Sequence, residues 1–209
     1  MKLQISFDVL DLDKAINIAK QVAEFADILE VGTILLHKYG VKAAEAFATK
    51  FEDKDILADT KIIDRGKDIV DIYSQVNIKW LTVMAGTSNS VIHRACSETQ
   101  KHKINVMLDM VDSEAPGQSA LEAKNLGVDA ILFHQAYDVE KETALFLDNL
   151  DMVQGNTDLP IFISAKINRN NIEKIMDTKP SGIVVGKSIT ESDDPVEEAK
   201  FFYNLCKKI

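Results

Sequence analysis

Short apolar runs of strand character alternate along the chain with longer segments of helical periodicity. This alternation is typical of repeated β-strand and α-helix units built around a parallel sheet. The predicted strands lie at residues 3–8, 27–32, 55–59, 80–85, 104–109, 130–134, 160–164 and 182–186. Helical patterns between and after them are clearest at residues 13–26, 91–102, 119–127 and 195–208.

The number and spacing of the strands predict a closed barrel. They recur about every 25 residues, near the lower limit for a (β/α)₈ TIM barrel. An open doubly wound sheet is the alternative, but it normally has fewer strands and a glycine-rich phosphate loop after the first strand. No such loop follows residues 3–8. We therefore expect an α/β fold, with one (β/α)₈ barrel domain over residues 1–209.

Composition narrows the classes of function. A formal net charge of −9 disfavours a nucleic-acid groove, although a small phosphorylated ligand needs only a local positive pocket. The chain shows no secretory pattern at its start and no apolar run near the roughly 20 residues that span a bilayer. We expect a cytoplasmic protein with no membrane or nucleic-acid partner. Cys96 and Cys206 lie outside any C-x-x-C spacing, so we expect two buried or idle thiols and neither a metal site nor a disulfide.

Most of the predicted strands end in polar or ionisable residues. In a barrel of this type the carboxyl ends of the strands converge on one pocket, so these side chains are candidates for a shared site. Single aspartates at such positions are also explained as helix caps, but Glu30 has apolar neighbours and is a poor capping residue. The strand-end residues are Asp8, Glu30, Asp59 with Lys61, Asp109, His134, and Ser164 with Lys166.

The segment "LADTKIID" (57–64) carries three charges in a run that otherwise reads as a buried strand. Residues two apart on a strand point the same way, so Asp59 and Lys61 face one side together. Glu30 on the neighbouring strand can point inward beside them. Two carboxylates at a wet barrel mouth suit Mg²⁺, and a structural salt bridge is the alternative for this cluster.

The four histidines divide by position. His134 ends the predicted sixth strand and is a candidate acid or base, with a hydrogen-bonded core histidine as the alternative. The remaining histidines lie in helical or loop patterns and are expected on the surface, namely His37, His93 and His102.

With "LADTKIID" on the third strand, the chain resembles the orotidine 5′-monophosphate decarboxylase suprafamily, whose mark there is D-x-K-x-x-D. The resemblance covers essentially the full length and is closest to the metal-dependent branch, which comprises 3-hexulose-6-phosphate synthase and 3-keto-L-gulonate-6-phosphate decarboxylase. Three more segments resemble this branch, namely "MKLQISFDVLDLDKA" at the start of the chain, "EVGT" (30–33) and "VVGKSITESDDP" (184–195). An acid at residue 30, where orotidine decarboxylase has lysine, separates the branches.

The resemblance implies a role for each candidate. Glu30 and Asp59 would bind Mg²⁺, Lys61 would face the substrate oxygens, and Asp64 would reach into the site of the partner subunit in a homodimer. Asp109 and His134 would complete the catalytic set. The residues implied to bind a sugar-phosphate substrate are Asp8, Thr33, Lys166, Gly186 and Lys187.

Within the branch, "HQAYD" (134–138) is more similar to the synthases than to the H-R-S-R-D of the decarboxylases, and "MLDM" (107–110) points the same way. The expected reaction is the joining of formaldehyde and ribulose 5-phosphate through a metal-stabilised enediolate. Decarboxylation of 3-keto-L-gulonate 6-phosphate to L-xylulose 5-phosphate is the alternative. A sugar-phosphate-binding barrel without activity is a third, because Ala165 and Lys166 stand where relatives have the Gly-Gly that binds phosphate.

Overall fold

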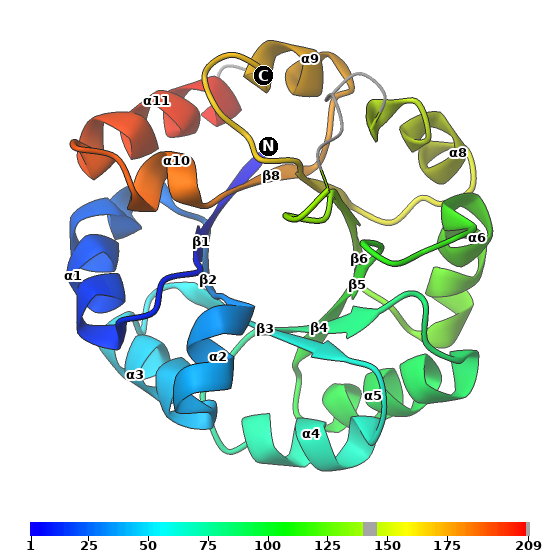
Figure 1. The fold of residues 1–209 in the computed structure, drawn as a ribbon. Coiled ribbons are helices and arrows are strands. Elements are labelled where there is room, and N and C mark those ends of the chain that lie inside the picture. The colour runs from blue at the N-terminus through cyan, green and yellow to red at the C-terminus, as the bar shows by residue number, and fades with distance from the viewer. Residues whose placement is uncertain (140–145, 208–209) are drawn as a thin grey trace.

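A computed structural model describes residues 1–139 and 146–207 of the chain. Its eight parallel strands close into a barrel in chain order, and Figure 1 shows helices arranged as a ring around them. This confirms the predicted (β/α)₈ barrel. The strands are β1 (Lys2–Phe7), β2 (Ile28–Val31), β3 (Asp55–Ile62), β4 (Trp80–Met84), β5 (Asn105–Asp109), β6 (Ala130–His134), β7 (Ile161–Ser164) and β8 (Gly182–Val185).

The helices connect successive strands. Their inner faces pack on the barrel through residues such as Phe47 and Phe202, which are fully buried. No helix within the described residues is long and apolar enough to cross a membrane. The helices are α1 (Leu12–Val22), the 3₁₀ helix η1 (Ala23–Phe25), α2 (Thr33–Tyr39), α3 (Val41–Lys50), α4 (Gly66–Tyr73), α5 (Asn89–Lys101), α6 (Pro116–Leu126), α8 (Leu150–Gln154), α9 (Ile172–Asp177), α10 (Lys187–Thr190) and α11 (Pro195–Lys207).

The barrel is filled by an apolar layer that is separate from the core under the helices. Side chains alternate between the two faces of a strand, so every second residue points inward. The inner layer excludes water from the half of the barrel nearer the amino ends of the strands. It supports the polar residues at the carboxyl ends. It consists of Ile28, Leu57, Trp80, Met107, Ala130, Leu132, Phe162 and Val184.

The inward-facing residue two positions further along most of these strands is polar. Leu57 is followed by Asp59, Met107 by Asp109, and Leu132 by His134. The same step leads from Ile28 to Glu30, Trp80 to Thr82 and Phe162 to Ser164. The strand period therefore places one polar layer directly above the apolar one, at the carboxyl end of the barrel.

Strand β3 is longer than predicted, because it continues past residue 59 to Ile62. Its register with β4 shifts between Ala58 and Ile62, where four steps along β3 match two along β4. Lys61 within this bulge has a φ of 44°, a left-handed conformation that non-glycine residues seldom adopt. The bulge aims the Lys61 side chain into the barrel mouth.

The two cysteines, Cys96 and Cys206, are free and buried, as the sequence predicted. Burial raises the pKa of the Cys96 thiol to about 12 and that of Cys206 to about 11. Both thiols are therefore protonated at neutral pH and pack as small apolar groups.

Candidate active site

A cavity of about 1120 Å³ opens at the carboxyl end of the barrel. Its wall combines ends of strands from both halves of the chain with the segments that follow them. Nine of the eleven predicted site residues line it, namely Asp8, Glu30, Thr33, Asp59, Lys61, His134, Lys166, Gly186 and Lys187.

Glu30 is 6% exposed and is held by two neutral donors from β1. Ser6 Oγ donates to one carboxylate oxygen at 2.7 Å, and Gln4 Nε2 donates to the other at 2.5 Å. Burial, together with the charges of Asp59 and Asp8, raises the pKa of Glu30 to about 7 against the opposing effect of these hydrogen bonds. The carboxylate is thus positioned, but its charge is not neutralised by its donors.

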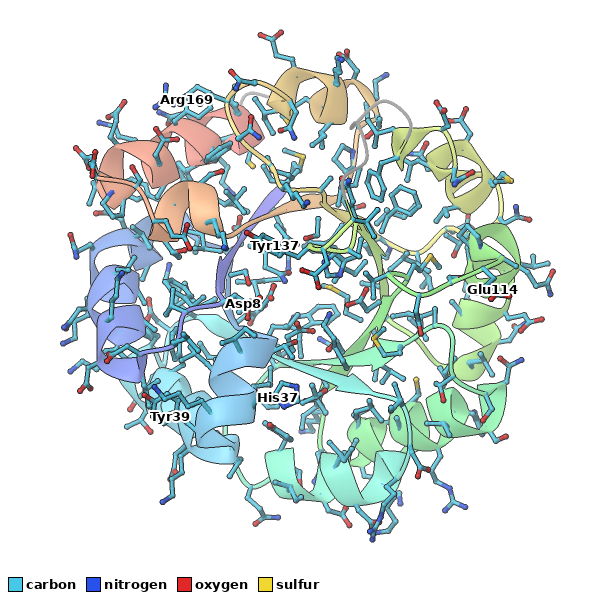
Figure 2. The ribbon with its side chains drawn as sticks, viewed as in Figure 1. Asp8, His37, Tyr39, Glu114, Tyr137 and Arg169 are labelled. Atoms are coloured by element: carbon cyan, nitrogen blue, oxygen red, sulfur yellow. The ribbon has the colours of Figure 1, made fainter. Side chains whose placement is uncertain are left out.

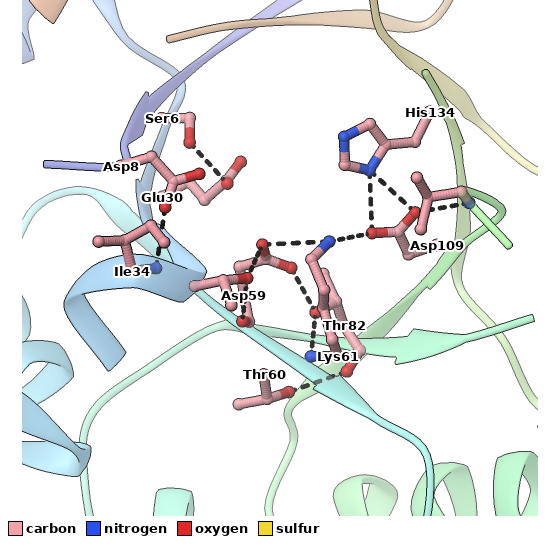
Figure 3. A network of polar contacts seen from close by, with 12 residues as sticks. Ser6, Asp8, Glu30, Ile34, Asp59, Thr60, Lys61, Thr82, Asp109 and His134 are labelled. Atoms are coloured by element: carbon pink, nitrogen blue, oxygen red, sulfur yellow. Dashed lines mark hydrogen bonds and ion pairs between the residues drawn. The ribbon is translucent and has the colours of Figure 1, made fainter. Parts of the chain in front are cut away.

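Asp59 is held by donors from three elements (Figure 3). Its Oδ1 accepts a hydrogen bond from Thr82 Oγ1 at 2.7 Å, and its Oδ2 accepts one from Thr33 Oγ1 at 2.5 Å. Lys61 Nζ lies 3.3 Å from Oδ2. Thr82 Oγ1 also accepts from the backbone N–H of Lys61 at 2.9 Å, so one hydroxyl stabilises both Asp59 and the bulge beside it.

Lys61 and His134 meet on Asp109, which is fully buried at the end of β5. Lys61 Nζ donates to Asp109 Oδ2 at 2.5 Å, and His134 Nδ1 lies 3.0 Å from both carboxylate oxygens. Burial opposes ionisation of Asp109, but the hydrogen bond and charge of His134, together with Lys61, lower its pKa to about 2. Asp109 is therefore a carboxylate at neutral pH.

The same contacts shift the pKa values of the two cations. Burial lowers the pKa of Lys61, but Asp59 and Asp109 outweigh it and raise the pKa above its ordinary value. Burial also lowers the pKa of His134, and the hydrogen bond to Asp109 and the charge of that carboxylate raise it overall. Since a carboxylate can only accept, Nδ1 of His134 carries the proton, and Figure 3 shows the second ring nitrogen pointing away from Asp109.

Asp8 completes the acidic side of the cavity. Its Oδ1 accepts a hydrogen bond from the backbone N–H of Ile34 at 3.0 Å. Gly32 permits this approach, because a Cβ atom at residue 32 would collide with the Asp8 carboxylate. The pKa of Asp8 is raised, mainly by burial and in part by the charge of Asp59.

These residues fit a hard divalent cation. Asp8, Glu30 and Asp59 converge on one cavity, and their mutual repulsion contributes to the high pKa of Glu30. A divalent cation between Glu30 and Asp59 would remove that repulsion, and Mg²⁺ prefers the oxygen ligands that these residues offer. The chemistry of these donors therefore suits a divalent cation, and the metal site stays a prediction.

A comparison with known protein families shows to which family the chain belongs. The model of the orotidine 5′-phosphate decarboxylase / HUMPS family matches residues 1–202. The chain belongs to this family. It is 28% identical over 200 residues to the 3-hexulose-6-phosphate synthase of Bacillus subtilis (strain 168), covering 95% of each chain. It is 29% identical over 201 residues to the synthase of Staphylococcus haemolyticus (strain JCSC1435), covering 96% of each.

Solved structures agree. A 3-hexulose-6-phosphate synthase from Salmonella typhimurium superposes with a TM-score of 0.92 and 25% identity, over 100% of this chain and 99% of that one. KGPDC from Streptococcus mutans superposes with a TM-score of 0.91 at 21% identity, over 100% of this chain and 98% of the other, which is a likeness of fold. The predicted suprafamily membership and the barrel are both confirmed.

Two predicted residues of this family member lie off the cavity wall. Asp109 does not line the cavity itself but contacts residues that do, through Lys61, His134 and the backbone N–H of Val111. Asp64 is exposed beyond the end of β3, and its Oδ1 accepts from the backbone N–H of Arg65 at 2.7 Å. Its proposed place in a partner's site stays a prediction. As expected, His37, His93 and His102 are exposed.

Sequence reasoning missed the residues that hold the predicted ones. Gln4 and Ser6 position Glu30, and Thr82 positions Asp59 and Lys61. Their signal in the sequence is the inward period of β1 and β4, which contain polar residues where the neighbouring positions are apolar. Tyr137 was also missed, although it lines the cavity beside Lys166 and Lys187.

Proposed function

We propose that the chain is a lyase of the 3-hexulose-6-phosphate synthase type, which joins formaldehyde to ribulose 5-phosphate. The observation that carries the proposal is the chain of contacts Asp59–Lys61–Asp109–His134 beside Glu30 in a single open cavity. The arrangement combines a fixed cation, an oriented imidazole and a carboxylate pair that suits Mg²⁺. Relatives named 3-hexulose-6-phosphate synthase that align over nearly the full chain support the choice of reaction.

His134 is the proposed base. Asp109 holds its Nδ1–H, so Nε2 has a lone pair with which to accept a proton from C1 of ribulose 5-phosphate. The C1 carbanion then attacks the carbon of formaldehyde, a C–C bond forms, and the formaldehyde oxygen becomes an alkoxide. The imidazolium returns its proton to that alkoxide, which gives 3-hexulose 6-phosphate and regenerates the base.

Lys61 is the proposed electrostatic partner of the developing negative charge. Asp59 and Asp109 keep it protonated and fix its ammonium group, so its attraction for an enediolate oxygen requires little rearrangement. Glu30 and Asp59 would hold Mg²⁺. When bound, that ion would act as a Lewis acid toward the carbonyl and hydroxyl oxygens of the ketose.

The charge distribution of the cavity supports a phosphorylated substrate. Asp8 follows β1, and Glu30 and Asp59 lie in β2 and β3, whereas Lys166 and Lys187 follow β7 and β8. An extended sugar phosphate can place its reactive end at the acidic side and its phosphate at the basic side. Asp8 and Thr33 would border the sugar, and Gly186 would border the phosphate.

We also propose a homodimer in which Asp64 enters the cavity of the partner subunit. In its own subunit Asp64 is exposed and does not line the cavity, so a role in catalysis requires a second copy. Ile63 next to it is 64% exposed and Ile72 on α4 is 51% exposed. Exposed isoleucines within the segment 63–72, which also contains Asp64, suit a surface that a second copy covers.

Parallel assays separate the proposed reaction from its rivals. The protein would be incubated with ribulose 5-phosphate plus formaldehyde, and separately with 3-keto-L-gulonate 6-phosphate, each with Mg²⁺ and with EDTA. We expect Mg²⁺-dependent formation of 3-hexulose 6-phosphate. Turnover of the second substrate alone would identify a decarboxylase, and turnover of neither would indicate a binding protein.

A further inference from the structure

The basic side of the cavity is organised around one aromatic ring. Tyr137, in the segment after β6, lies toward the barrel opening, whereas Glu114 and Arg169 lie at the outer rim (Figure 2). Lys187 Nζ donates to Tyr137 Oη at 2.7 Å and lies 4.4 Å from the ring centroid. Lys166 Nζ lies 5.2 Å from the same centroid. One side chain therefore gathers two ammonium groups from different strands.

The backbone presents Lys166 to this ring in an unusual way. Lys166 has a φ of 48°, the left-handed conformation that glycine adopts most easily. Its Nζ also donates to the backbone carbonyl of Val139 at 3.1 Å, which ties the end of β7 to the Tyr137 segment. The chain thus has a long cationic side chain in a backbone conformation that glycine, which has no side chain, would adopt more easily.

We propose that Tyr137 is a specificity-determining residue that joins Lys166 and Lys187 into a side-chain clamp for the phosphate group of the substrate. The inference rests on the proposed function, since it assigns the phosphate end of that same substrate. No chemistry is required of the clamp. It binds a dianion and fixes the distance from phosphate to the reactive carbon.

The chemistry of the three side chains fits this role. Each ammonium offers several donors, and hydrogen bonds between charged groups are stronger than neutral ones. Tyr137 Oη accepts from Lys187, so its own O–H can be donated to a phosphate oxygen. Lys187 is also 3.4 Å from Glu191, and binding of phosphate would replace that exposed ion pair, which is weak.

Substitutions test the clamp without removing the proposed catalytic groups. The variants are K166A, K187A, Y137A and Y137F, assayed for kcat and KM with ribulose 5-phosphate and formaldehyde. We expect K166A, K187A and Y137A each to raise KM about tenfold or more, with kcat changed less than about threefold. Y137F keeps the ring but loses the hydroxyl, so its KM should lie between wild type and Y137A.

The matched control is Lys179→Ala. Lys179 is exposed and has a φ of 52°, close to that of Lys166, but it follows α9 and does not line the cavity. K179A therefore removes a lysine from a similar backbone position without touching the clamp, and its KM should equal that of wild type.

Calorimetry with inorganic phosphate separates this inference from the proposed function. We expect phosphate to bind wild type and K179A, and to bind K166A, K187A and Y137A about tenfold more weakly. Equal phosphate affinity and equal KM in Y137A and wild type would overturn the clamp while turnover stands. The opposite result is also possible: wild type turns over neither sugar phosphate, but the clamp variants lose phosphate binding. That result would uphold the clamp and overturn the proposed lyase function.

Discussion

Glu30 is a buried acid whose hydrogen-bond donors are both neutral. Its pKa of about 7 lies above the ordinary value of 4.5, so the folded protein binds more protons than the unfolded chain between those values. The free energy of unfolding therefore falls as pH rises from about 4.5 to about 7 and stays lower above that range, by on the order of 3 kcal/mol. Glu30, the proposed metal ligand, thus destabilises the protein above that pH range when no cation is bound.

Glu30→Gln should stabilise the metal-free protein at about pH 8, because it removes the buried charge. The new amide can accept from Gln4 and donate to Ser6 Oγ, so both hydrogen bonds survive. Thermal denaturation in EDTA would show a higher Tm for E30Q than for wild type, with a smaller difference near pH 5. An equal difference at both pH values would contradict the raised pKa of Glu30.

Asp109 sets the protonation of His134. Against the effect of burial, its hydrogen bond and charge raise the pKa of the imidazole above 6.5. Because the neutral imidazole is the proposed base, kcat/KM should rise as pH increases through that pKa. Asp109→Asn removes the charge, so the pKa of His134 measured by NMR should fall, with a large loss of kcat. An unchanged pKa in D109N would exclude this account.

At the scale of elements, the end of β3 depends on a hydroxyl from β4. Thr82 donates to Asp59 and accepts from the backbone of Lys61, where the regular ladder between the strands is interrupted. The side chain replaces a backbone partner that the bulge removes, and it fixes Asp59 and Lys61 relative to one another.

Thr82→Val should remove both contacts at nearly constant volume. We expect a loss of about 1–3 kcal/mol in the free energy of unfolding and a fall in kcat/KM of about tenfold or more. Thr82→Ser keeps the hydroxyl and should retain most of both. Urea denaturation measures the free energy of unfolding of the two variants, and steady-state kinetics measures their kcat/KM. A T82V protein as active as T82S would show that the hydroxyl does not position the site.

The strands and the polar layer were predictable because they follow the two-residue period of a strand. Glu30, Asp59 and His134 could be placed at the cavity from position alone, since each ends a predicted strand. The bulge at Lys61 was not predictable, because it arises from a register shift against β4 and leaves no turn residue in the sequence.

The contacts that hold the site were also out of reach. Gln4, Ser6 and Thr82 act through hydrogen bonds to other strands, and the partners depend on register between segments more than twenty residues apart. Tyr137 joins lysines that follow two other strands. Such pairings are set by barrel closure, which no local pattern encodes.

At the scale of the whole molecule, the proposed dimer gives Asp64 its role. Mixing two inactive variants, K61A and D64A, tests it. If Asp64 acts across the interface, each mixed dimer contains one cavity with both Lys61 and the partner's Asp64. Random exchange would then restore about a quarter of wild-type activity. No recovery in a mixture shown by native mass spectrometry to contain mixed dimers would place Asp64 in its own subunit's site or outside the site.

We propose above all that this barrel generates an enediolate from ribulose 5-phosphate with the help of Lys61 and a divalent cation. The most direct measurement is exchange of the C1 proton of ribulose 5-phosphate with deuterated solvent, followed by NMR without formaldehyde. We predict exchange by wild type with Mg²⁺, loss of exchange in EDTA, and a decrease of about a hundredfold or more in Lys61→Ala. Absence of exchange in wild type, or exchange that neither EDTA nor K61A reduces, would contradict the claim.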